Sequence, residues 1–219
     1  MNARGLIESA HGLLVDLDGT LVDSTAPVHR AWSHFAARHG LDAEHVHRFA
    51  QGRPSRESVR LLVPGANHAA EAEALERAEL GDVDGIVALP GAAELLSGGW
   101  RLAVVTSCSR ALAHMRLRAA GLPIPTALVS ADDVERGKPD PTCYLLGAAR
   151  LGVDPAGCVV LEDAPAGISA GRAAGARVLA VRTTHADHDL GDADLIVDDL
   201  SQIGRGHDGN GARCAAAPD

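Results

Sequence analysis

Aromatic residues are almost absent from this sequence, and lysine occurs only once. Aromatic residues make up 2% of the 219 residues, while hydrophobic residues make up 46%. A buried core must therefore be packed mainly by alanine, leucine and valine. A chain of this length can hold one sizeable domain, or one core with a modest insertion.

The scarcity of cysteine and of long apolar segments excludes several classes of protein. Cys108, Cys143, Cys158 and Cys214 form no CxxC pair and lie far apart, so neither a disulfide framework nor a zinc site is expected. No run of about 18 apolar residues is present to form a membrane helix. The first residues, MNARGLIESAHG, lack the apolar region of a secretion signal. We expect a reduced, cytoplasmic protein without a membrane partner.

Basic residues are outnumbered by acidic ones, 20 to 29, and the formal net charge is −9. A nucleic-acid partner would require a basic patch, so none is expected. An anionic small molecule would have to be bound by a local cationic site, because the overall field repels it. Nothing in the sequence indicates an oligomer, so a monomer is expected.

Six short apolar runs rich in valine and leucine are bounded by glycine, proline or charged residues. Such runs are typical of strands buried on both faces of a parallel sheet. Helical patterns alternate with them, which predicts a doubly wound, Rossmann-like α/β domain. The expected strands are 11–16, 101–106, 127–130, 158–162, 177–181 and 194–197, and the expected helices are 90–96, 110–120, 141–151 and 165–174.

The segment 23–89 interrupts this alternation. It contains no convincing strand and predicts four helices, at residues 27–39, 43–49, 56–62 and 66–80. We expect a helical cap at 23–89, inserted into a discontinuous core formed by residues 1–22 and 90–200. Residues 201–219 contain almost no large apolar side chain, and they are expected to be a disordered tail.

Two aspartates, Asp16 and Asp18, follow the first predicted strand. Residues two apart on a strand point to the same side, so both carboxylates are expected at the carboxyl edge of the sheet, where open α/β sheets bind ligands. Adjacent carboxylates repel unless a cation or a shared proton separates them. The pair therefore indicates a metal site with a nucleophile beside an acid/base, and a charged strand-to-loop transition is the alternative.

Other candidate residues follow later strands. Lys138 is the only lysine among 20 basic residues; an ammonium is a compact point charge that can sit between a carboxylate and a phosphate oxygen. Glu162 and Asp163 follow another apolar run, and carboxylate oxygens at a sheet edge are suitable ligands for Mg²⁺. A helix N-cap is the alternative role for Asp163.

These residues carry a family resemblance. The stretch DLDGTLVDS resembles the first motif of the haloacid dehalogenase superfamily in its phosphatase form. Thr106-Ser107, Lys138 and Glu162-Asp163 resemble the second, third and fourth motifs, in the expected order. The chain looks most like bacterial sugar and polyol phosphatases of the β-phosphoglucomutase-like subfamily, including through DSTAPVHRAW, IVALPGA and GKPDPTCYLLGA.

The resemblance implies a magnesium-dependent phosphatase that acts on small sugar or polyol phosphate monoesters. Asp16 would attack phosphorus and form an aspartyl-phosphate. Asp18 would protonate the leaving alcohol and then deprotonate the hydrolytic water. The phosphoryl oxygens would be bound by Thr106, Ser107 and Lys138.

The resemblance also implies how Mg²⁺ would be held. Asp16, the backbone carbonyl of Asp18 and Asp163 would be ligands, with Glu162 bound directly or through water. Thr20 would brace the loop that positions Asp18.

The helical insertion resembles the small cap of the superfamily, which closes over the site and carries specificity. Gly52, Arg53 and Arg56 form the stretch expected to face the substrate, although pairing of the arginines with carboxylates such as Glu57 is an equal alternative. The histidines between residues 29 and 47 bring no three side chains onto one helical face and are expected at the surface.

Alternative functions differ in how well they fit. A dehalogenase needs no acid/base two residues after the nucleophile, so Asp18 argues against that activity. A phosphonatase of this superfamily would need a lysine in the cap, and segment 23–89 contains none, so that activity is excluded. A sugar-phosphate mutase related to β-phosphoglucomutase shares the motifs and stays open, as does a phosphoglycolate phosphatase. A catalytically silent binding module is remote, because Asp16, Asp18, Lys138 and Asp163 are all present.

Overall fold

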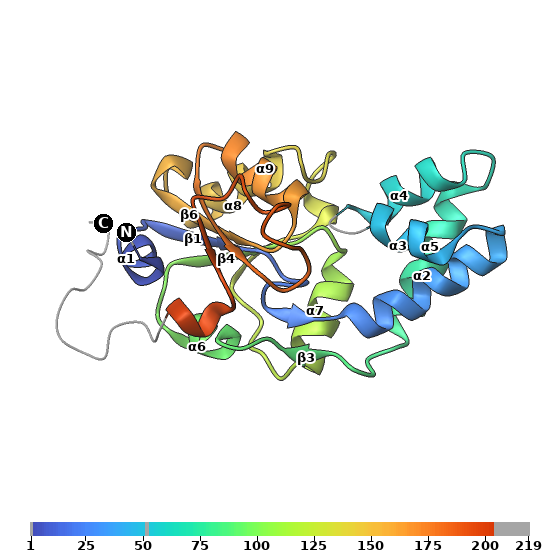
Figure 1. Cartoon of the computed structure of the whole chain (residues 1–219), viewed down its shortest axis with the longest axis horizontal. Coiled ribbons are helices and arrows are strands. Elements are labelled where there is room, and N and C mark those ends of the chain that lie inside the picture. The colour runs from blue at the N-terminus through green and yellow to red at the C-terminus, as the bar shows by residue number, and fades with distance from the viewer. Residues whose placement is uncertain (1, 51–52, 204–219) are drawn as a thin grey trace.

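The six apolar runs form one parallel sheet (Figure 1) in the computed structural model, which describes residues 2–50 and 53–203. The strand order is β5-β4-β1-β6-β7-β8. The strands are β1 (Gly12–Val15), β4 (Leu102–Val105), β5 (Ala127–Val129), β6 (Cys158–Glu162), β7 (Arg177–Val181) and β8 (Leu195–Val197). Each agrees with the sequence prediction to within one residue at either end.

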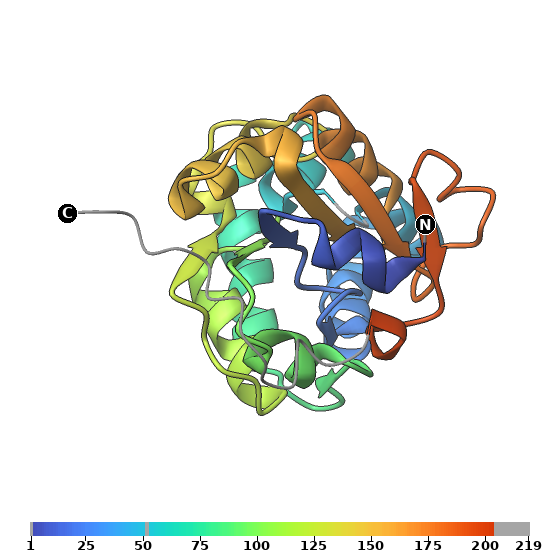
Figure 2. The ribbon, with the colours of Figure 1, turned by 90° about the vertical axis from the view of Figure 1, so that its left-hand side faces the viewer.

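Helices cover both faces of this sheet, which confirms the predicted doubly wound α/β fold. Along β1, Leu13 and Val15 enter one buried cluster and Leu14 enters the other, as the pleat of a strand requires. Figure 2 shows α8 and α9 on one side of the strands and α6 and α7 on the other. The core helices are α1 (Ala3–Glu8), α6 (Ala92–Ser97), α7 (Arg110–Ala119), α8 (Thr142–Leu151) and α9 (Pro165–Ala173).

The first helix, α1, is absent from the sequence prediction. Its N-cap is Asn2, whose side chain accepts a hydrogen bond from the Gly5 N–H at 2.9 Å. Leu6 and Ile7 are buried against the sheet. A helix of six residues is shorter than two turns, so it leaves no readable apolar period.

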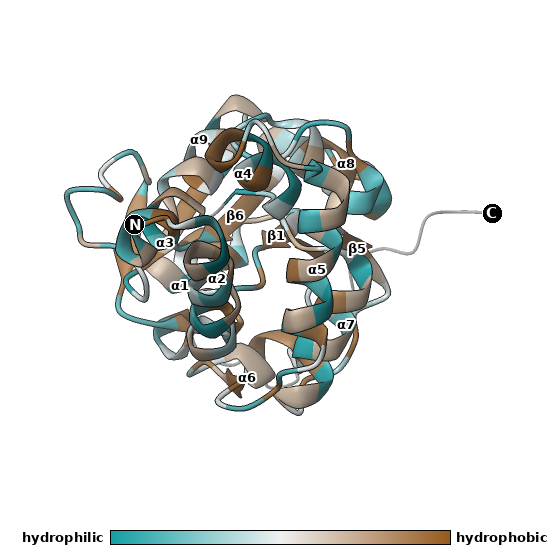
Figure 3. Ribbon diagram, turned by 90° about the vertical axis from the view of Figure 1, so that its right-hand side faces the viewer, coloured by the Kyte–Doolittle hydropathy of each residue, from teal (hydrophilic) through white to brown (hydrophobic). Residues whose placement is uncertain are grey.

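Four helices lie between the first two strand-end motifs and build a core of their own. Trp32, Phe35 and Leu75 belong to a buried cluster that is separate from the two clusters at the sheet. Viewed from their side in Figure 3, these helices lie in front of β1 and β6. They are α2 (Thr25–His39), α3 (Ala43–Ala50), α4 (Ser55–Leu62) and α5 (His68–Leu80). Within the described residues, no helix is both long and apolar enough to cross a membrane.

The absence of strands predicted for the inserted segment is wrong near its C-terminal end, where β3 (Val87–Ala88) lies, and β2 (Val22–Asp23) stands at its N-terminal boundary. Strand β2 pairs in antiparallel register with β3, which joins the two chain connections to the helices. The Leu89 N–H also donates to the Leu21 carbonyl at 3.0 Å. Two-residue strands are too short to show an alternating pattern, so only the pairing reveals them.

The end of the described chain departs from the expected tail. Residues 201–203 lie in the 3-10 helix η3 (Leu200–Ile203), and Leu200 and Ile203 are buried against the core. The rest of the predicted tail, 204–219, lies outside the described residues.

Candidate functional site

Candidate residues from separate parts of the sequence meet at the carboxyl edge of the sheet. Asp16 follows β1, Thr106 follows β4, and Glu162 and Asp163 stand at the end of β6. Lys138 reaches the same place from the loop before α8. All five side chains are buried in the described structure. The topology therefore gathers them at the edge where parallel sheets bind ligands.

Lys138 is the cation at the centre of this group. Its Nζ donates to Oδ1 of Asp16, to Oε1 of Glu162 at 2.7 Å and to the Val105 carbonyl at 3.2 Å. Burial disfavours the ammonium, but the Asp16 and Glu162 carboxylates outweigh it and raise the pKa of Lys138 well above its ordinary value. The lysine is therefore a fixed positive charge beside Asp16.

Glu162 has hydrogen-bond donors on both of its carboxylate oxygens. Oε1 accepts from Lys138 and, at 2.8 Å, from the hydroxyl of Tyr144 on α8. Oε2 accepts from the backbone N–H groups of Asp163 at 2.9 Å and Ala164 at 3.0 Å. A Cβ on Gly167 would lie 1.6 Å from Oε1, so only glycine fits there. The carboxylate is thereby fixed in place.

Asp16, Glu162 and Asp163 form a buried acidic cluster. One oxygen from each lies within 4.8 Å of the other two. Burial raises the pKa of Asp16 to about 8. The neighbouring carboxylates add to this rise, and the positive charge of Lys138 opposes it. Burial and then the charges of Glu162 and Asp16 raise the pKa of Asp163 well above its usual range. Buried, mutually repelling oxygen donors fit a hard divalent cation such as Mg²⁺.

Asp163 is held by two threonines. The Thr184 hydroxyl donates to Oδ2, and the Thr20 hydroxyl donates to Oδ1 at 3.4 Å. Gly19 has a φ of 85°, and a Cβ on it would lie 2.2 Å from Asp163 Oδ2. Thr20, which the sequence analysis places in support of Asp18, thus contacts Asp163. Nothing in the sequence marks Thr184, which lies beyond the fourth motif.

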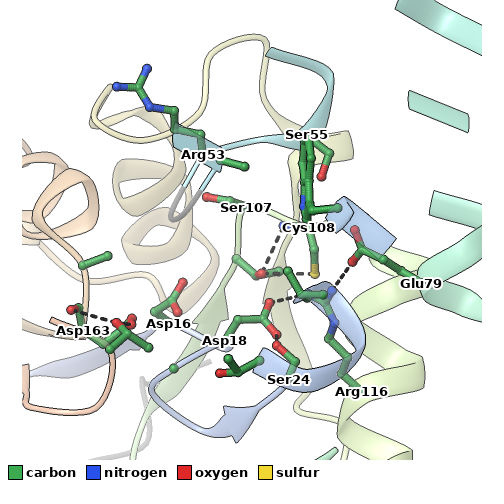
Figure 4. A pocket seen from close by; sticks show the side chains of 18 of the residues that line it. Asp16, Asp18, Ser24, Arg53, Ser55, Glu79, Ser107, Cys108, Arg116 and Asp163 are labelled. Atoms are coloured by element: carbon green, nitrogen blue, oxygen red, sulfur yellow. Dashed lines mark hydrogen bonds and ion pairs between the residues drawn. The ribbon is translucent and has the colours of Figure 1, made fainter. Parts of the chain in front are cut away.

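Asp18 points away from the acidic cluster. Its Oδ1 accepts from the Ser24 hydroxyl at 2.6 Å, and its Oδ2 accepts from Nη1 of Arg116 at 2.6 Å. Figure 4 shows the Asp18 carboxylate directed toward Ser24 and Arg116, whereas Asp16 lies nearer Asp163. The two aspartates share one sheet edge, as their spacing predicts, but their carboxylates have different partners. Sequence reasoning missed Ser24 and Arg116.

The loop after β4 places Thr106, Ser107 and Cys108 beside the aspartates. The Thr106 hydroxyl accepts from the Cys108 N–H at 3.2 Å and lies 3.2 Å from the Cys108 sulfur. Burial, with a contribution from the Asp18 charge, raises the pKa of the Cys108 thiol to about 12. The cysteine is therefore a neutral part of the wall.

A cavity of about 250 Å³ opens between this sheet edge and the inserted helices. Asp16, Asp18 and Lys138 line it from the sheet. From the inserted segment it is lined by His29 and Trp32 of α2, His47 of α3, and Arg53, which precedes α4. The two histidine rings stack with centroids 3.9 Å apart; His29 is exposed, as the sequence predicts, whereas His47 is half-buried. No motif identifies this pair.

The predicted cap residues have different positions. Arg53 lines the cavity, is exposed, and places its guanidinium 4.9 Å from the centre of the Phe49 ring. Arg56 lines a second cavity of about 350 Å³, which Thr106 to Cys108 also border. Gly52 lies outside the described residues.

Comparisons with known proteins agree with this geometry. A family model described as haloacid dehalogenase-like hydrolase matches residues 11–175. Hexitol phosphatase A from Escherichia coli K12 is 48% identical over 199 residues, covering 88% of this chain and 92% of that protein. Fructose-1-phosphate phosphatase YqaB from the same organism is 35% identical over 187 residues, covering 81% of this chain and 99% of that protein. The crystal structure of CbbY from Rhodobacter sphaeroides in complex with phosphate superposes with a TM-score of 0.79 at 26% identity, covering 90% of this chain and 97% of the other.

Proposed function

The chain belongs to the haloacid dehalogenase-like hydrolase family, and from this premise we propose that it is a magnesium-dependent phosphatase of small sugar or polyol phosphate monoesters. The resemblance to this family that the motifs indicate is confirmed by the family match. Relatives that cover most of the chain carry the names hexitol phosphatase and fructose-1-phosphate phosphatase. Both names describe enzymes that remove phosphate from polyhydroxylated carbon chains.

One observation carries the proposal: a buried carboxylate, Asp16, lies at a strand end with a buried ammonium, Lys138, hydrogen-bonded to it. A phosphate ester is an anion and would be repelled by a bare carboxylate. The fixed charge of Lys138 offsets that repulsion and stabilises negative charge on the phosphoryl oxygens. Such a site favours attack of Asp16 on phosphorus over simple anion binding.

In the proposed reaction, an Asp16 oxygen forms a bond to phosphorus as the bond from phosphorus to the ester oxygen breaks. Asp18 gives a proton to that oxygen, which leaves as a neutral alcohol. In the second half, Asp18 takes a proton from water as the water oxygen attacks phosphorus, which releases inorganic phosphate and restores Asp16. The Thr106 hydroxyl, the Ser107 N–H and the Lys138 ammonium hold the phosphoryl oxygens.

Asp16, the Asp18 backbone carbonyl and Asp163 would hold Mg²⁺. The ion supplies charge neutralisation at the phosphoryl group and at the clustered carboxylates. Glu162 is the least suited of the acidic residues to direct contact, because four donors already occupy its oxygens. We propose that it acts by fixing Lys138 and the backbone of Asp163, and reaches the ion at most through water.

The net charge of −9 and the lack of a membrane-spanning helix among the described residues support an enzyme of small phosphate esters that has no nucleic-acid or membrane partner. We propose that it works as a cytoplasmic monomer. Size-exclusion chromatography with light scattering tests the oligomeric state, and a stable dimer would contradict it.

The decisive experiment measures phosphate release from hexitol, fructose, glycerol and glycolate phosphates, with and without Mg²⁺. Asp16→Asn should abolish release, because an amide cannot form the acyl phosphate. Asp23→Asn is a matched control, since among the described residues the Asp23 carboxylate accepts a local hydrogen bond from the Thr25 N–H at 2.9 Å and is outside the acidic cluster. A preference for phosphoglycolate would contradict the proposed substrate class and identify a phosphoglycolate phosphatase. Conversion of hexose 1-phosphate to 6-phosphate without release would identify a mutase, and inactivity on every substrate would contradict the proposal.

A further inference from the structure

Arg116 is a buried cation that none of the sequence motifs contains. It lies on α7, and its side chain is only 5% exposed. Nη1 donates to Asp18 Oδ2 at 2.6 Å, and Nη2 donates to Oε2 of Glu79. One guanidinium therefore holds two carboxylates. A guanidinium is planar and always charged, so it fixes the direction of each partner.

The second carboxylate comes from the inserted helices. Glu79 lies in the last turn of α5, and its side chain is also 5% exposed. The chain Glu79, Arg116, Asp18 therefore runs from an inserted helix, through a core helix, to the catalytic loop. Figure 4 shows the three side chains in this order along one wall of the cavity.

Asp18 has no freedom to turn while these contacts exist. Ser24 donates to its Oδ1 and Arg116 to its Oδ2, so both oxygens are held from the side away from Asp16. Proton transfer to a leaving oxygen requires placement within hydrogen-bond reach, and a misplacement of about 1 Å can cost about 10²-fold in rate. The contacts that Ser24 and Arg116 make with Asp18 should therefore affect the rate of proton transfer to the leaving oxygen.

We propose that Arg116 is a positioning residue that places the Asp18 carboxyl group for proton transfer to the leaving alcohol, and that Glu79 holds Arg116 for this task. The inference rests on the proposed phosphatase function. In the step concerned, the bond from phosphorus to the ester oxygen breaks, its electron pair stays on that oxygen, and the Asp18 proton is transferred to it. Arg116 exchanges no proton and touches no reacting atom.

Substrates with different leaving groups distinguish a positioning role of Arg116 from a purely structural one. A hexitol leaves as an alcohol and needs the proton of Asp18, whereas p-nitrophenolate is a stable anion that leaves without one. The ratio kcat/KM reports the steps up to loss of the leaving group. A misplaced Asp18 should therefore affect kcat/KM for sorbitol 6-phosphate and spare kcat/KM for p-nitrophenyl phosphate.

The experiment compares Arg116→Gln, Glu79→Gln and wild type on these two substrates in saturating Mg²⁺. For Arg116→Gln we expect kcat/KM to fall about 10²-fold with sorbitol 6-phosphate and less than about threefold with p-nitrophenyl phosphate. Glu79→Gln should show the same selectivity with a loss of about tenfold. Arg118→Gln, an exposed arginine on the same helix, is the matched control and should change neither value.

An equal loss with both substrates, or no loss with either, would overturn the inference and leave the phosphatase function intact. Thermal melting shows whether Arg116→Gln is folded, because unpairing a buried charge is costly. If Arg116→Gln unfolds, the substrate selectivity of Glu79→Gln tests the inference, since that variant keeps Arg116 and an oxygen acceptor for its guanidinium. A wild-type enzyme that releases phosphate from neither substrate would overturn the proposed function and the inference together.

Discussion

The ammonium of Lys138 lies 2.7 Å from Oε1 of Glu162 and also donates to Asp16. The only lysine of the chain therefore joins the ends of β1 and β6, two neighbouring strands of the sheet. A compact ammonium can contact both carboxylates and the Val105 carbonyl at once. This contact explains in physical terms why a chain with 19 arginines among its 20 basic residues has lysine here.

Replacing Lys138 by arginine should not preserve activity. A guanidinium is larger and planar, and the Lys138 side chain is 3% exposed among Asp16, Glu162 and Val105. We expect kcat to fall by about 10²-fold or more, the usual loss when a charge-stabilising group is misplaced. Steady-state phosphate release measures this. Arg136→Lys, in the same loop and highly exposed, is the control; full activity of Lys138→Arg would contradict the role of a compact charge.

Asp163→Asn should abolish the thermal stabilisation by Mg²⁺ without lowering the melting temperature of the metal-free protein. The substitution takes one charge out of a buried cluster in which Asp16, Glu162 and Asp163 repel one another. We expect the melting temperature without metal to be equal to that of wild type or higher by about 2–4 °C, and Mg²⁺ to raise it only in wild type. Scanning fluorimetry with EDTA or Mg²⁺ gives both values. Asp132→Asn, outside the cluster, should behave as wild type; an Asp163→Asn protein that Mg²⁺ still stabilises would argue against Asp163 as a ligand.

Asp133 should contribute stability that depends on pH. Its partial burial is outweighed by hydrogen bonds from Arg150 and Ser130 and by the charge of Arg110, which hold the pKa of Asp133 well below its usual range. A lowered folded-state pKa gives stability that is complete above the unfolded-state pKa, about 4, and is lost as the pH falls through the folded value. We expect Asp133→Asn to cost about 1–2 kcal/mol at neutral pH, because both arginines are partly in solvent.

Urea unfolding of Asp133→Asn and wild type at a series of pH values tests this sign. The difference between the two proteins should be constant from pH 7 to about pH 5 and shrink below about pH 4. A difference that grows as the pH falls would show that the assignment of the ion pair is wrong.

Gly167→Ala should damage the site although alanine is the better helix former. A Cβ at this position would lie 1.6 Å from Glu162 Oε1, and Glu162 is fixed by its donors. We expect a loss of about 2 kcal/mol or more in unfolding free energy, together with loss of activity. Gly171→Ala on the same helix is the control, because the three atoms nearest to its Cβ would be side-chain methyl groups at 3.1 Å, which can shift slightly. Equal effects of the two substitutions, measured by urea unfolding and phosphate release, would contradict the explanation.

The sheet and the residues at its edge were accessible from sequence because they depend on local patterns. Strands buried on both faces appear as continuous apolar runs, and all six were found to within one residue at either end. The carboxyl ends of parallel strands meet at one edge, so Asp16, Thr106 and Asp163 could be brought together without coordinates. The short α1 and the β2–β3 pair were missed, because elements of six and two residues carry no period.

The sequence by itself determined the fold class, the sheet edge at which the candidate site lies and the candidate residues that follow its strands. Only the tertiary structure decided which partners those residues have. Arg116 reaches Asp18 across 98 positions of the chain, and Tyr144 reaches Glu162 from a helix. Such contacts depend on how helices pack against a sheet and against each other. Apolar periodicity specifies which face of a helix is buried, and it leaves open which distant side chain that face will meet.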